Sequence, residues 1–89
     1  MTMVLLAIDL ALAAGLIALA GVSLVTRDPN RAVVLFMTFG LLMAFTWARL
    51  NAPDIALVEA AIGSGLTGAL LLATINASKT SVDSNRAKD

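Results

Sequence analysis

Three long apolar stretches without a charged residue divide the chain, at residues 10–26, 32–48 and 60–78. An α-helix rises about 1.5 Å per residue, so roughly 20 residues cross the hydrocarbon core of a bilayer. The stretches are too long for buried strands and too apolar on every side for surface helices. The pattern therefore predicts an all-α membrane protein with three transmembrane helices, at about residues 3–25, 31–50 and 53–77.

Two short polar segments separate the predicted helices. In the first, Asp28 or Thr26 is expected to cap the second helix, and Pro29 suits the first turn of that helix. In the second, Asn51 is the expected N-cap of the third helix, and Asp54 lies in its first turn, where the helix dipole favours a negative charge. Both segments thus have the composition of tight turns between antiparallel helices.

The positive charges are distributed unequally about the predicted helices. With three spans, the first turn and the C-terminal segment lie on the same side, and that side has five of the six Lys and Arg residues. By the positive-inside rule the N-terminus is expected outside and the C-terminus inside, with Arg49 as the one outer cation. Residues 1–77 then form the transmembrane domain, and residues 78–89 form a polar, mobile cytoplasmic tail.

The composition argues against several classes of function. The chain has no cysteine and no histidine, so common metal ligands, nucleophiles and general bases are missing. The net charge is zero and no basic stripe exists, which argues against nucleic-acid binding. We therefore predict a non-catalytic protein with no cofactor and no metal site.

Acidic residues near or inside the predicted helices are the candidates for function. Glu59 lies about five residues past Asp54 in the third helix, and an intramembrane carboxylate is by default a candidate for an ion path. Asp9 is at a similar depth in the first helix, although it could lie at the outer interface, and Asp54 could form an outer mouth. Arg49 could neutralise any of the three acids. Glu59 could alternatively be part of a structural ion pair with Arg49.

Small residues mark where membrane helices can approach closely. In the first helix, their default role is packing within the chain, at Ala7, Ala11, Gly15 and Ala18. The third helix has two small faces, and one neighbouring helix cannot cover both, which leaves a surface for another subunit; the faces are Ala60, Ser64 and Gly68, and Ala61, Gly65 and Ala69. Glycines also weaken a helix, so a π-bulge or kink is expected around Gly63, Gly65 and Gly68.

Two motifs resemble those of a known family. Residues 26–33, TRDPNRAV, resemble its first-loop motif aRDLlRAV, and residues 51–63, NAPDIALVEAAIG, resemble its signature GAPDVALTEAaiG. The family is the D subunit of membrane-bound hydrogenases, which is homologous to part of the C-terminal region of the A subunit of Mrp-type antiporters and related to the J subunit of complex I. The resemblance covers residues 1–77.

The resemblance implies a small subunit of a complex that moves H⁺ or Na⁺ through a bacterial or archaeal cytoplasmic membrane. It implies other membrane subunits as partners, and it places Glu59 in an ion pathway at a subunit interface. The chain departs from the family pattern in having Asn51 for the usual glycine, Val58 for a common threonine and Pro29 for the usual leucine. Two alternatives remain open: a holin-like self-assembling pore, and a purely structural membrane subunit.

Overall fold

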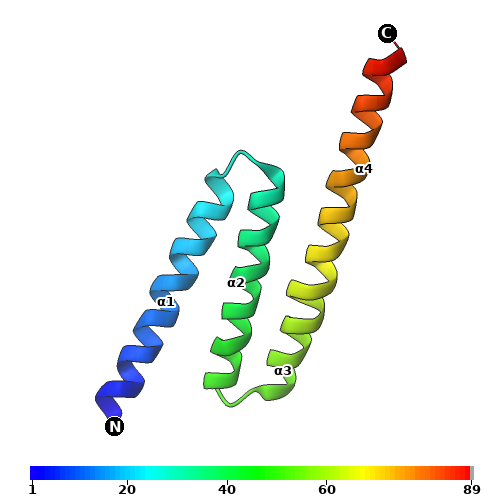
Figure 1. Ribbon diagram of the computed structural model, residues 1–89. Helices are drawn as coiled ribbons and strands as arrows, with labels where there is room; N and C mark the ends of the chain where they lie inside the picture. Colours follow the sequence, from blue (N-terminus) through cyan, green and yellow to red (C-terminus); the bar gives the residue numbers. More distant parts are fainter. Residues whose placement is uncertain (89) are drawn as a thin grey trace.

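The computed structural model describes residues 1–88, which form three long helices joined by two short turns (Figure 1). The first two helices are α1 (Thr2–Val25) and α2 (Pro29–Arg49). The third is continuous through three segments, which are α3 (Pro53–Val58), the π-helix η1 (Glu59–Leu66) and α4 (Thr67–Lys88). Within residues 1–88, three helices are long and apolar enough to cross a membrane. The predicted all-α membrane fold is confirmed.

The three helices lie side by side in a single layer, with α2 in the middle (Figure 1). In the described residues, α1 packs only on α2 and does not contact the third helix. The molecule is only 12 Å thick in its smallest dimension, which is about the diameter of one helix with its side chains. Both broad faces of this layer are therefore uncovered, and side chains as well shielded as Val33, Ala44 and Ser64 are few.

The first turn follows the sequence-based expectation, and the second does not. Asp28 caps α2 by accepting a hydrogen bond from the backbone N–H of Asn30 at 3.1 Å, and Pro29 begins the helix. At the second turn, the prediction that Asn51 caps the third helix is wrong, because the cap position is Ala52, which makes no side-chain bond. Asn51 instead has a φ of 61°, in the left-handed region that glycine and asparagine tolerate best.

The third helix continues past its expected end at residue 77 and reaches Lys88. No glycine or proline follows Gly68 to interrupt the hydrogen-bond ladder. Lys79 and Asp83 also have opposite charges one helical turn apart, a spacing that stabilises a helix. The segment expected to be a mobile tail is thus helical over residues 78–88, while Asp89 lies outside the described residues. Its separation from the transmembrane domain stays a prediction.

Candidate functional site

Glu59 is the first residue of the π-helix, and it is half-buried. Its carboxyl group lies against the α-carbon of Gly63, one turn further along the helix. A Cβ atom built on Gly63 would lie 2.7 Å from Glu59 Oε1 and 3.0 Å from Glu59 Cδ. A residue with a side chain at this position would have to displace the carboxyl group. The glycine therefore makes room for the acid that the sequence singles out.

The π-helix occupies the segment in which the sequence predicts a π-bulge or a kink, and that prediction is confirmed. In a π-helix each N–H bonds to the carbonyl five residues earlier, which widens the turn. Gly65 suits this geometry, because a Cβ there would lie 3.3 Å from the carbonyl oxygen of Ala60. Gly68 follows in α4, and the space that its missing side chain leaves is filled by Met37 of α2. The three predicted glycines therefore serve three separate contacts.

Ser64 joins the π-helix to α2. Its side chain is the most buried polar group described, at 2% exposure, and its hydroxyl donates a hydrogen bond to the carbonyl oxygen of Met37 at 2.7 Å. Opposite it, a Cβ on Gly40 would lie 3.0 Å from Ser64 Cβ. One small face of the third helix thus packs on α2. The other, which we name the open small face, is exposed at Ala61, Gly65 and Ala69.

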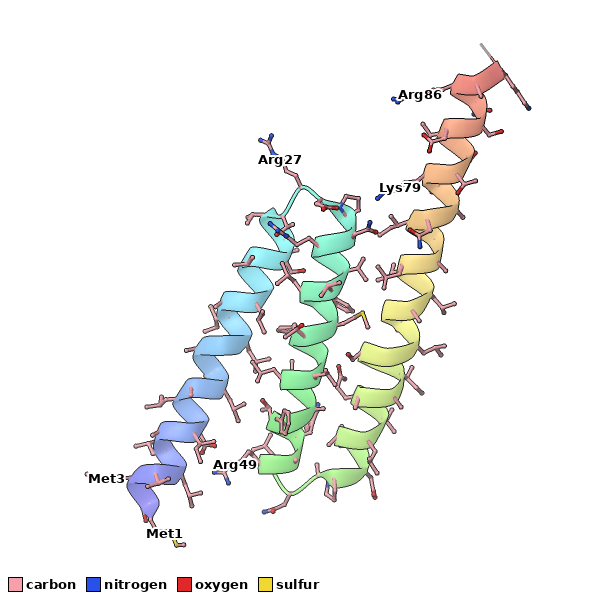
Figure 2. The ribbon with its side chains drawn as sticks, viewed as in Figure 1. Met1, Met3, Arg27, Arg49, Lys79 and Arg86 are labelled. Carbon is pink, nitrogen blue, oxygen red and sulfur yellow. The ribbon has the colours of Figure 1, made fainter. Side chains whose placement is uncertain are left out.

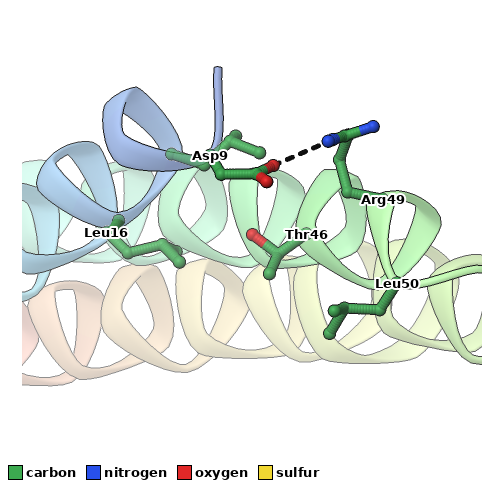
Figure 3. A pocket seen from close by; sticks show the side chains of 7 residues that line it. Asp9, Leu16, Thr46, Arg49 and Leu50 are labelled. Carbon is green, nitrogen blue, oxygen red and sulfur yellow. Dashed lines mark hydrogen bonds and ion pairs between the residues drawn. The ribbon is translucent and has the colours of Figure 1, made fainter. Parts of the chain in front are cut away.

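Arg49 forms an ion pair with Asp9, which is one of the three partners that the sequence allows. Its Nε donates a hydrogen bond to Asp9 Oδ1 at 2.9 Å (Figure 3), and the two side chains are 36% and 52% exposed. No ion pair within residues 1–88 involves Glu59 or Asp54. Asp54 is exposed in the first turn of α3. The structure therefore does not bring the three acids together in one site.

The small residues of α1 do not form the internal contact that was expected. Gly15 does face α2, since a Cβ there would lie 2.9 Å from Leu42 Cδ2. Ala7, Ala11 and Ala18 are exposed, because the helix turns its larger residues toward α2. Sequence reasoning also missed the contact between Gly40 and Ser64. A glycine among large apolar residues in the middle of a predicted helix was the available signal.

These observations define a class of protein. Three membrane-length helices in one layer, with both faces open and few buried side chains, are the features of a small multi-pass membrane protein that is covered by lipid or by other subunits.

Comparison with known proteins narrows this class to a family. Residues 14–80 match the family described as MbhD, the D subunit of the membrane-bound hydrogenase MBH, and the chain belongs to that family. An uncharacterized protein of Methanocaldococcus jannaschii is 40% identical over 53 residues, which cover 60% of this chain and 67% of the relative. No solved structure matches the chain. Family membership makes it an accessory membrane subunit of a multisubunit complex of the hydrogenase or Mrp-like type.

Proposed function

We propose that the chain contributes Glu59 to an ion pathway at a subunit interface of an Mrp-like complex that translocates cations and protons. The observation that supports this is the half-buried carboxyl group at the start of the π-helix, which forms no ion pair within residues 1–88. At about 1.5 Å per residue, it lies roughly 7 Å inward from Asp54. Keeping an acid at that depth is costly, which favours a functional reason for it. The transported ion is H⁺, with Na⁺ as the second candidate.

The two other acids differ in their support for such a role. Asp54 is exposed at the start of the third helix, as an outer mouth of the pathway requires. Asp9 is held by Arg49 on the far side of α2, away from the third helix. A pathway role for Asp9 stays a prediction, and its ion pair supports a structural role equally well.

The placement of the cations supports an orientation with the N-terminus outside. Arg27, Lys79 and Arg86 lie at one end of the molecule, and Met1 and Arg49 lie at the other (Figure 2). The positive-inside rule places the first end in the cytoplasm of a bacterial or archaeal cell, with the chain in the cytoplasmic membrane. In this proposal the chain is non-catalytic, and any redox or antiport step belongs to other subunits.

The open small face supports the subunit interface. Ala61, Gly65 and Ala69 lie on the same helix as Glu59, and small residues let a second helix approach closely. A purely structural subunit is the second candidate, which the flat single layer of helices favours. Membership in the MbhD family supports either role over a holin-like pore.

The test replaces Glu59 with Gln in the intact complex. Assembly is measured by co-purification of the other subunits, and proton movement by a pH-sensitive dye in inverted membrane vesicles. We expect normal assembly with strongly reduced cation-coupled proton movement. Asp83→Asn removes an acid from the exposed end of α4 and is the matched control. Normal assembly together with normal proton movement in Glu59→Gln would overturn the proposal in favour of the structural role.

A further inference from the structure

A pocket with a cavity volume of about 290 Å³ lies between α1 and α2, beside the ion pair of Asp9 and Arg49 (Figure 3). The polarity of its wall changes along the helix axis. Asp9 and Arg49 lie at its outer end, while Leu12 and Leu16 follow on the same face of α1. At about 1.5 Å per residue, these leucines lie roughly 4.5 and 10 Å further into the layer than Asp9. The pocket is thus charged at its mouth and apolar in its depth.

The charged groups at the mouth have binding capacity to spare. A guanidinium group has five N–H donors, and Arg49 uses the one on Nε for Asp9 Oδ1. Within residues 1–88, no other hydrogen bond or ion pair is formed by the Nη atoms of Arg49 or by Oδ2 of Asp9. The pair therefore presents one cation and one anion side by side, each with free positions for a further partner.

The surroundings of the pair are apolar in both directions. Residues 1–8 of the chain continue beyond the ion pair, as Met1 and Met3 show in Figure 2, and their apolar side chains are exposed. On the inner side lie Leu12 and Leu16. Polar groups that lack partners are costly in such surroundings. A ligand for this mouth must accordingly have two opposite charges and an attached apolar chain.

We propose that this pocket binds a phospholipid with a zwitterionic headgroup, in which an ammonium and a phosphate group are close together. The phosphate accepts hydrogen bonds from the Nη atoms of Arg49, whose planar fork suits phosphate oxygens. The ammonium group lies against the carboxylate of Asp9. The first part of an acyl chain lies along Leu12 and Leu16. This site lies on the opposite side of α2 from Glu59 and does not depend on the proposed ion pathway.

Native mass spectrometry on the purified full chain tests the proposal with defined lipids. The probes are phosphatidylethanolamine, phosphatidylglycerol, which lacks the ammonium group, and free phosphoethanolamine, which lacks the acyl chains. We expect phosphatidylethanolamine to be retained best and free phosphoethanolamine not to compete. Arg49→Gln should weaken binding about tenfold, as expected for loss of hydrogen bonds to a charged group.

Two further variants separate lipid binding from the stability of the fold. Leu16→Trp fills the apolar depth and leaves both charges in place, so it should also weaken binding. Arg27→Gln removes a cation from the other end of the molecule and should leave binding unchanged. Equal retention of both lipids by the wild type and by Arg49→Gln would overturn the proposal. Competition by free phosphoethanolamine as strong as that of the lipid would replace the lipid with a soluble ligand.

The intact complex provides the last measurement. A photoreactive diazirine residue in place of Leu12 should crosslink to phospholipid when the complex is illuminated in its membrane. Crosslinking to another protein subunit would overturn the proposal, because the pocket would then be covered by a protein partner.

Discussion

The hydroxyl of Ser64 donates a hydrogen bond across 2.7 Å to the main-chain carbonyl of Met37, and so joins the π-helix to the middle of α2. The carbonyl of a helical residue normally accepts from its own helix, so this bond uses its second lone pair. The serine side chain is almost fully buried. Its position one turn from Glu59 makes the bond a direct determinant of how the π-helix lies against α2.

Ser64→Ala should lower the free energy of unfolding in lipid by about 0.6 kcal/mol, the average for a hydrogen bond between membrane helices. Steric trapping in bicelles can measure the change. Thr74→Ala is the matched control, because the Thr74 hydroxyl donates to Leu70 of its own helix and is exposed. If both variants lose the same stability, the bond between the helices has no special role.

Gly40→Ala should destabilise the chain more than Ser64→Ala does. The added Cβ would lie 3.0 Å from Ser64 Cβ and 3.3 Å from Ser64 Cα, and the backbone atom can yield only if the two helices separate. Overpacking of this kind costs about 1–3 kcal/mol.

Gly21→Ala is the control for helix propensity in the same unfolding measurement. Nothing lies within 4 Å of a Cβ at Gly21, so this change should be neutral or stabilising by up to about 1 kcal/mol. Equal effects of the two substitutions would contradict the close approach of α2 and the π-helix.

The sequence was sufficient for the helices because long apolar runs leave few alternatives in a bilayer. The distortion at Gly63 was also predictable, since glycines accumulate there next to an acid. The pairing of Arg49 with Asp9 was not, because three acids were possible partners and the choice depends on α1 lying on the far side of α2. The end of the third helix was missed for another reason. A polar helix that leaves the membrane has the same composition as an irregular tail.

Gly63→Ala should move the carboxyl group of Glu59 with little change in stability. The new Cβ would lie 2.7 Å from Oε1, so the flexible glutamate must yield rather than the backbone. The gain from helix propensity is about 0.5–1 kcal/mol and offsets part of the strain. The ¹³C resonance of the Glu59 carboxyl, recorded with selectively labelled protein, should shift. An unchanged resonance would show that the acid does not rest against Gly63.

Substitutions at Asn51 should follow the backbone conformation of the second turn. With a φ of 61°, Asn51→Gly should be neutral, whereas Asn51→Val should destabilise the chain by about 1–2 kcal/mol. The resemblance to a family with glycine at this position agrees with this expectation. Unfolding in bicelles measures both variants. A glycine variant that is as unstable as the valine variant would indicate that the asparagine side chain, and not the backbone, is what matters.

The last eleven described residues, 78–88, should exchange their amide hydrogens much faster than the rest of the third helix. They are helical, but every one of them is exposed. An isolated helix of this length is marginal in water, because it has too few hydrogen bonds to offset the cost of nucleation. Hydrogen–deuterium exchange with mass spectrometry on the chain in nanodiscs should therefore show early exchange after residue 77 and strong protection around Ser64. In the assembled complex, slow exchange of the same segment would mean that another subunit packs against it.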